Sequence, residues 1–195
     1  MWCTQFAGGM TPLPSLMSAI QILAISGSLR AASINSTLLR ASARLAPHDV
    51  HVKLFSGIGE LPLFNPDLEP RRPARVAVYQ AEVASADALL IASPEYAHGV
   101  TGTIKNALDW LVSFEPFVNK PVAMFNASPR AHHADDALRE TLKTMSACIV
   151  EPASISIPLL GAHLTEEGMA THPEIAQSIR GALEALRSFA VQSPR

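Results

Sequence analysis

Short apolar runs recur along the chain, separated by longer segments in which apolar residues return every three or four positions. The runs at 20–25, 87–93 and 121–125 are almost uninterrupted, which is typical of strands buried on both faces of a parallel sheet. The run at 50–55 alternates apolar with polar residues, and a weaker run lies at 147–150. We therefore predict a strand at each of these positions.

The segments between and after these runs have helical periodicity, with apolar residues on one side of each predicted helix. They predict helices over 33–45, 76–83, 104–111, 138–145 and 171–186. Ser33 stands where an N-cap is expected, and Thr171 to Glu174 has the form of a capping box. The stretch 56–73 is rich in proline and glycine and predicts a long loop.

Alternation of strands and helices predicts an α/β domain built on a doubly wound parallel sheet, with helices on both faces. The strand order 2-1-3-4-5 fits this pattern, although periodicity alone does not separate it from the dinucleotide-binding order. A chain of 195 residues with 48% apolar residues is long enough for one domain with a real core. In either order, the ligand lies beyond the carboxyl ends of the strands where the order reverses.

The first loop (residues 27–36) follows the strand at 20–25 and leads into a helix. Hydroxyl, amide and guanidinium groups that can donate hydrogen bonds to an anion are concentrated in it, on Ser28, Arg30, Ser33, Asn35 and Ser36. Backbone N–H groups at the helix N-terminus add to this preference for a phosphate. The alternative is a helix cap rich in serine and asparagine, with a solvated arginine.

The second loop (residues 93–102) follows the central predicted strand and contains Pro94, Glu95, Tyr96 and His98. It brings an aromatic ring, an imidazole and glycines to a position where a planar ligand can lie. Glu95 is interpreted as an anchor for a helix end rather than as a catalytic acid. Tyr96 as a half-buried tyrosine and His98 as a surface histidine remain the alternatives.

The third loop (residues 126–134) contains Ser128, Arg130 and the pair His132-His133. A metal site is not expected here, because adjacent histidines rarely direct both rings at one ion and the spacing supplies no third ligand. We expect the pair to make loop contacts or contacts beside a phosphate. Arg130 is expected to meet either a nucleotide phosphate or solvent.

Several classes of function are disfavoured by the motifs that are absent. The chain has neither the glycine-rich loop with Lys-Ser/Thr of nucleoside triphosphatases nor Gly-x-Gly-x-x-Gly nor Gly-x-Ser-x-Gly. The formal charge of −2 and the lack of a basic stripe argue against nucleic acid or an anionic membrane as partner. Cys3 and Cys148 match no zinc spacing, and a disulfide between them is not expected.

The first 18 residues differ in character from the rest of the chain. They contain Gly8-Gly9, Pro12 and Pro14 and lack the basic and apolar regions of a signal peptide. We predict that residues 1–18 form a flexible N-terminal tail and that residues 19–195 form the folded domain. Met10 and Met17 both precede the first predicted strand, so the tail is interpreted as the product of an upstream start codon.

Two motifs occur together, each after the strand where it would be expected. Gly27-Ser28-Leu29-Arg30, with Ser33 and Asn35, is followed by Pro94-Glu95-Tyr96 and by the segment from Gly102 to Trp110, which reads Gly-Thr-Ile-Lys-Asn-Ala-Leu-Asp-Trp. At this spacing the chain resembles the NADPH-dependent FMN reductase family, a group of flavodoxin-like proteins that includes quinone reductases, chromate reductases and azoreductases. The resemblance extends from about Ile20 to Val150.

The resemblance implies a flavodoxin-like, three-layer α/β/α fold with a five-stranded parallel sheet in the order 2-1-3-4-5, which binds FMN non-covalently. It assigns the phosphate contacts to Ser28, Arg30, Ser33, Asn35 and Ser36, the contacts beside the flavin ring to Pro94, Glu95, Tyr96 and His98, and a third-loop contact to Ser128. Members often carry paired glycines in the third loop, where this chain has Arg130 and His133-Ala134. That departure leaves open how the nicotinamide nucleotide reaches the flavin.

The expected function is ping-pong hydride transfer from NADPH or NADH to bound FMN and then to a small electron acceptor such as a quinone or free flavin. Because the flavin carries the chemistry, no side-chain general acid or base is expected. The helix end at Leu108-Asp109-Trp110 is similar to a segment at the family's dimer contacts, which implies a homodimer or homotetramer, and we expect a cytoplasmic location.

Two alternatives stay open. One is an FMN-binding electron carrier or redox-sensing module without efficient NAD(P)H turnover. Carriers tend to be strongly acidic, so the near-neutral charge of −2 favours the enzyme. The other alternative is an α/β domain that binds a different phosphate and no flavin.

Overall fold

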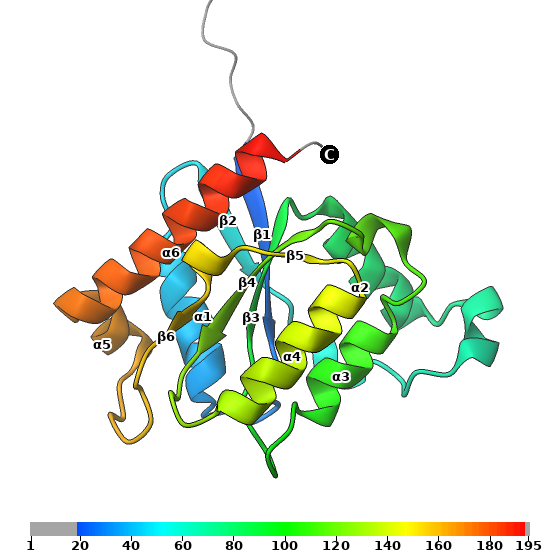
Figure 1. Ribbon diagram of the computed structural model, residues 1–195, viewed down its shortest axis with the longest axis horizontal. Helices are drawn as coiled ribbons and strands as arrows, with labels where there is room; N and C mark the ends of the chain where they lie inside the picture. The colour runs from blue at the N-terminus through cyan, green and yellow to red at the C-terminus, as the bar shows by residue number, and fades with distance from the viewer. Residues whose placement is uncertain (1–18, 194–195) are drawn as a thin grey trace, which may run out of the picture.

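The computed structural model describes residues 19–193, which form a parallel sheet between two layers of helices (Figure 1). The strands are β1 (Ile20–Ser26), β2 (Val50–Leu54), β3 (Ala88–Ala92), β4 (Pro121–Asn126), β5 (Cys148–Ile149) and β6 (Ile155–Ser156). They lie in the order β2-β1-β3-β4-β5, and β6 pairs with β4 as well. All neighbouring strands are parallel, which confirms the predicted fold class and strand order.

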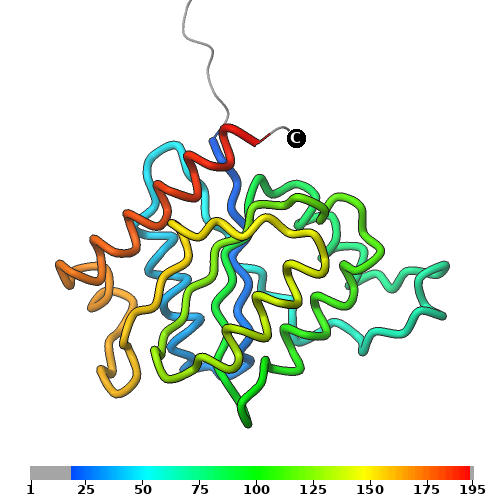
Figure 2. Tube along the Cα trace, viewed as in Figure 1, coloured from blue at the N-terminus to red at the C-terminus, as the bar shows by residue number. Residues whose placement is uncertain are grey.

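The helices divide between the two faces of the sheet, as the trace in Figure 2 also shows. They are α1 (Ile34–Leu45), α2 (Ala74–Ser85), α3 (Gly102–Asp109), α4 (His132–Thr144), α5 (Glu166–Thr171) and α6 (Pro173–Gln192). One core cluster joins the sheet to α1, α5 and α6, and the other joins it to α2, α3 and α4. Both faces of the sheet are therefore buried.

Strand β1 illustrates why an uninterrupted apolar run suits this position. Successive side chains of a strand point to opposite faces. Ile22 and Ala24 belong to the core cluster on the α1 side, whereas Leu23 and Ile25 belong to the cluster on the α2 side. An alternating apolar and polar run would leave one of these two clusters incomplete.

The fifth strand differs from its prediction over 147–150. It covers only Cys148–Ile149, because the chain turns at Val150 into a short 3-10 helix at Glu151–Ala153 that contains Pro152. The second half of β4 is paired instead by β6, which the sequence pattern did not predict. The predicted loop 56–73 contains two further 3-10 helices, Ile58–Glu60 and Pro66–Arg71.

The capping box predicted at Thr171 to Glu174 is wrong. Thr171 is the last residue of α5, and its hydroxyl donates to the carbonyl oxygen of Glu167 at 2.9 Å. Helix α6 begins at Pro173 with His172 as its N-cap, and no side-chain cap hydrogen bond forms there. A separate short helix occupies the segment that the pattern treated as a helix start.

The N-terminal tail predicted for residues 1–18, together with Cys3, lies outside the described residues. Cys148 has a free thiol. Between residues 19 and 193, no helix combines the length and apolar character needed to cross a membrane.

Candidate functional site

Strands β1, β3 and β4 end at the same edge of the sheet (Figure 1). A pocket of about 320 Å³ lies among the loops that follow them. Small-molecule sites typically enclose roughly 300–1,000 Å³. The three loops expected to meet here do so, and one residue comes from the segment after β6. The lining consists of Ser28, Arg30, Ser33, Ile34, Asn35, Ser93, Pro94, Glu95, Tyr96, Asn126, Ala127, Ser128, Arg130, Ala131 and Leu160.

The first loop supplies hydrogen-bond donors to one end of the pocket. Ser33 is the N-cap of α1, as predicted, and its hydroxyl oxygen accepts from the backbone N–H of Ser36 at 3.3 Å. The N–H groups of Ile34 and Asn35 stand in the first helical turn, where no intrahelical carbonyl is available to them. The exposed guanidinium of Arg30 lines the same pocket. This end of the pocket therefore favours an anion.

Asn35 and Ser36 are both buried, but they face different surroundings. Asn35 lines the pocket, is 4% exposed, and its buried Oδ1 has no hydrogen-bond partner among the described residues. Ser36 does not line the pocket; its hydroxyl lies 2.8 Å from that of Ser26. Ser26 Oγ in turn accepts from the N–H of Ser28 at 3.3 Å. Ser36 thus supports the backbone of the first loop through Ser26 and does not line the pocket, where the sequence had placed it.

The first and second loops are joined at Gly27. A Cβ atom at this position would lie 2.7 Å from Ser93 Cβ and 3.1 Å from Ser93 Cα. Thr101, the N-cap of α3, donates its hydroxyl to the carbonyl oxygen of Gly27 at 2.8 Å and accepts from the N–H of Ile104 at 3.2 Å. The glycine permits this close approach, which brings the ends of β1 and β3 together.

The second loop contains a tight two-residue turn beside the pocket. Tyr96 and Gly99 exchange backbone hydrogen bonds of 3.2 and 3.0 Å. Ala97 and His98, between them, have φ angles of 49° and 59°, in the left-handed region that side chains disfavour. Tyr96 lines the pocket with 53% of its surface exposed, whereas His98 does not line the pocket and has a side chain that is 77% exposed.

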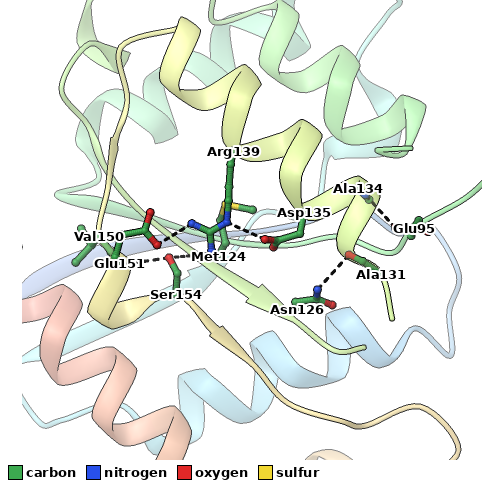
Figure 3. Close-up of polar contacts among 10 residues, drawn as sticks. All are labelled: Glu95, Met124, Asn126, Ala131, Ala134, Asp135, Arg139, Val150, Glu151 and Ser154. Carbon is green, nitrogen blue, oxygen red and sulfur yellow. Dashed lines mark hydrogen bonds and ion pairs between the residues drawn. The ribbon is translucent and has the colours of Figure 1, made fainter. Parts of the chain in front are cut away.

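Glu95 connects the second loop to α4 (Figure 3). Its Oε2 accepts from the backbone N–H of Ala134 at 2.9 Å, in the first turn of a helix whose N-cap, Ala131, offers no side-chain acceptor. Glu95 Oε1 lies 3.5 Å from Nδ1 of His98. The carboxylate therefore serves as the helix-end anchor that the sequence indicated, favoured by the helix dipole.

The third loop is held by the side chain of Asn126 (Figure 3). Its Nδ2 donates to the carbonyl oxygen of Ala131 at 3.2 Å, and its Oδ1 accepts from the N–H of Ser128 at 2.9 Å. The N–H of Ala131 donates to the carbonyl oxygen of Ser128 at 2.9 Å, which closes a turn with Pro129 and Arg130 at its centre. One amide thus fixes both ends of the turn.

Helix α4 is tied to the segment after β5 by Arg139. The guanidinium donates to Asp135 and to Glu151, each at 2.7 Å (Figure 3). Desolvation lowers the pKa of Arg139, but the hydrogen bonds and charges of Asp135 and Glu151 outweigh it and raise the pKa overall. The helix that follows the third loop is consequently held at its first and second turns.

Three histidine rings lie together outside the pocket. The ring of His133 is 4.5 Å from that of His98 and 4.0 Å from that of His132, measured between centroids. Between residues 19 and 193, no group of three or more His, Cys, Asp or Glu side chains is arranged to hold a metal ion.

Sequence reasoning missed three lining residues that shape the pocket. Ser93 and Asn126 stand at the ends of β3 and β4, so their positions next to strand ends were a usable signal. Leu160 is 66% exposed and arrives from the segment after β6, for which no local pattern gave a signal.

The chemistry of this lining fits FMN. The phosphate end has hydroxyl, guanidinium and helix N-terminal donors and no carboxylate within the first loop. The buried, unpartnered Oδ1 of Asn35 can accept from a hydroxyl of a polyol chain. Pro94 and Tyr96 supply apolar surface for a planar ring.

Comparison with known proteins agrees with this assessment. Residues 20–160 match the family described as NADPH-dependent FMN reductase. The chain is 32% identical to an NAD(P)H-dependent FMN reductase of Pseudomonas aeruginosa over 174 residues, which cover 86% of this chain and 94% of the relative. It is 33% identical to a quinone reductase of Escherichia coli over 113 residues, covering 56% and 60% of the two chains.

A solved structure supports the same relationship. FerB of Paracoccus denitrificans, described as a flavoenzyme NAD(P)H:(acceptor) oxidoreductase, superposes with a TM-score of 0.74 at 25% identity, covering 89% of this chain and 98% of FerB. With the strand order and the first- and second-loop motifs, these matches show that the chain belongs to the NADPH-dependent FMN reductase family.

Proposed function

We propose that this protein is an FMN-dependent NAD(P)H oxidoreductase that reduces a quinone, a flavin or a similar small acceptor. The observation that carries the proposal is the pocket at the ends of β1, β3 and β4, with anion donors at one end and an exposed tyrosine beside it. When bound, FMN supplies the hydride-accepting and hydride-donating chemistry. The protein contributes binding, orientation and electrostatics.

The first loop is proposed to hold the phosphate of FMN. Arg30 donates charged hydrogen bonds, Ser28 and Ser33 donate hydroxyl hydrogens, and the first turn of α1 adds backbone N–H groups. Asn35 accepts from the ribityl chain through its buried oxygen. Ser36 has an indirect part, because its hydroxyl supports Ser26 and through it the backbone of Ser28.

The second and third loops are proposed to frame the flavin ring. Pro94 and Tyr96 provide packing surface, and Ser128 offers polar groups from the opposite loop. Glu95 acts by fixing the second loop to α4, and not as a proton donor. His98 is a surface residue of the turn. It is proposed to affect the flavin site only indirectly, through its contact with the carboxylate of Glu95.

We further propose a ping-pong order, in which NAD(P)H and the acceptor use the same opening in turn. Pro94, Tyr96 and Ser128 line one pocket, so the donor and the acceptor would reach a flavin bound there through the same opening. Parallel lines in double-reciprocal plots, at several fixed acceptor concentrations, would support this order; intersecting lines would refute it.

The decisive experiment is an anaerobic absorbance titration of purified protein with FMN and then NADPH. Bound flavin that bleaches with NADPH and recovers its colour with a quinone supports the enzyme. Bound flavin that NADPH and NADH leave unchanged would identify the alternative, an electron carrier or redox-sensing module. The formal charge of −2 favours the enzyme, because carriers tend to be more acidic.

A homodimer or homotetramer is proposed as well. Leu108 and Trp110, from the helix end that resembles a family dimer contact, are already buried within the chain, and Trp110 Nε1 donates to the carbonyl oxygen of Pro62 at 2.8 Å. Nearby Leu63 and Val112 are exposed and apolar, so these residues are available for a subunit contact. Light scattering tests the mass. We propose a cytoplasmic location because the reaction consumes NAD(P)H, and cell fractionation tests it.

A further inference from the structure

Two arginines line the pocket, and they come from different loops. Its charged lining residues are Arg30, Arg130 and Glu95. Neither arginine forms an ion pair with any residue between 19 and 193. Arg30 belongs to the first loop, after β1, and Arg130 to the third loop, after β4, on the other side of β3 in the strand order. A phosphate held by Arg30 at the start of α1 would therefore leave Arg130 available for a second anion.

In the second loop and the first turns of α4, the carboxylates of Glu95 and Asp135 are already engaged, whereas Asp136 is exposed and forms no ion pair with residues 19–193. Glu95 accepts from the N–H of Ala134 and faces His98. Asp135, in the first turn of α4, accepts from Arg139 at 2.7 Å. No acidic residue lies between 126 and 134. The third loop itself therefore contributes no carboxylate that would repel a second anion.

The backbone that carries Arg130 is fixed in place. Asn126 binds both ends of its turn, at 2.9 and 3.2 Å, and Pro129 restricts the residue before it. His132 Nδ1 lies 3.2 Å from the carbonyl oxygen of Arg130, which gives the turn a further contact. Arg130 is thus an exposed side chain on a backbone turn that hydrogen bonds hold in place, and its guanidinium can bind two phosphate oxygens at once.

We propose that Arg130 binds a phosphate group of the nicotinamide dinucleotide and positions the nucleotide at the pocket. This inference rests on the proposed function, because it takes NAD(P)H as the donor. A quinone acceptor carries no phosphate and is better matched by the exposed apolar surfaces of Tyr96 and Leu160. The dinucleotide has two sources of phosphate, the 2′-phosphate of NADPH and the pyrophosphate shared with NADH.

The test uses FMN-loaded protein and isothermal titration with two probes, adenosine 2′,5′-bisphosphate and adenosine 5′-diphosphate. Arg130→Ala is compared with Arg130→Lys and with Arg180→Ala, an exposed arginine on α6 that does not line the pocket. We expect Arg130→Ala to raise the dissociation constant of at least one probe about tenfold, the scale of one exposed charged hydrogen bond. Arg130→Lys should lose part of this affinity and Arg180→Ala none.

The pattern across the probes identifies the phosphate. A loss confined to the 2′,5′-bisphosphate assigns Arg130 to the 2′-phosphate and predicts a matching rise in KM for NADPH but not NADH. A loss with both probes, or with the 5′-diphosphate alone, assigns it to the pyrophosphate, and both KM values should rise.

The inference is overturned if wild-type protein binds neither probe, or if Arg130→Ala binds both as well as wild type does. It is also overturned if Arg130→Ala weakens FMN binding while leaving the probes unaffected, since Arg130 would then belong to the flavin phosphate. Failure of the proposed function looks different: the wild-type protein would bind no FMN, or would not oxidise NAD(P)H.

Discussion

Replacing Gly27 with alanine tests the joint between the first and second loops. The added Cβ would lie 2.7 Å from Ser93 Cβ and 3.1 Å from Ser93 Cα, closer than ordinary van der Waals contact. Gly27 cannot easily move away, because its N–H donates to the carbonyl oxygen of Ala92 at 2.8 Å and its own carbonyl accepts from Thr101 at 2.8 Å. We expect Gly27→Ala to lower the free energy of unfolding by about 1–3 kcal/mol, the usual cost of overpacking.

The same substitution should weaken FMN binding, because separating β1 from β3 moves the first loop relative to the second. Urea unfolding gives the stability, and quenching of flavin fluorescence gives the affinity. Gly181→Ala, within α6, is the matched control: its Cβ would meet no atom within 4 Å. In a helix interior this change should raise stability by roughly 0.5–1 kcal/mol.

A double substitution identifies the cause. Ser93→Gly removes Oγ and Cβ, the two nearest of the three Ser93 atoms that the added Cβ would meet, so the pair should recover most of the lost stability and show favourable coupling. Gly27→Ala with a stability within about 0.5 kcal/mol of wild type would refute the crowding argument. Absence of coupling with Ser93→Gly would place the cost elsewhere than at this contact.

Three further substitutions probe the phosphate contact, a buried hydroxyl and an ion pair. Arg30→Ala should weaken FMN binding by about 1.5–3 kcal/mol, and an unchanged affinity in a fluorescence titration would contradict the first-loop assignment. Tyr79→Phe should raise the free energy of unfolding by about 1 kcal/mol, because the buried hydroxyl has no partner among the described residues; urea unfolding that shows a loss would contradict this. The hydrogen bond from Arg187 holds the pKa of Asp49 below its usual 3.8. The wild-type protein should therefore be more stable than Asp49→Asn at neutral pH and should lose that advantage as the pH falls below 3.8. A difference in melting temperature that persists in strong acid would exclude this mechanism.

Most of the residues that the loop motifs proposed for the site line the pocket. The motif and the rule for parallel sheets correctly predicted that the loops after β1, β3 and β4 would meet, and eight of the ten proposed residues line the pocket, all except Ser36 and His98. Ser36 does not line the pocket, and its hydroxyl instead forms a hydrogen bond of 2.8 Å with the hydroxyl of Ser26, at the end of β1. His98 turns outward because it occupies the tip of a tight turn. The contact between Ser26 and Ser36 joins the end of β1 to α1, so it depends on how that helix packs against the sheet.

The sequence by itself determined strands β1 to β4, the place of β5, most of the helices and the donor-rich first loop, because strand alternation, helical periodicity and capping act over a few neighbouring residues. The tertiary structure decided the contacts between distant segments. It brought Glu95 to the start of α4, paired β6 with β4 and added Leu160 to the pocket. These contacts join segments up to dozens of residues apart, and their geometry depends on how the sheet and its two helical layers pack.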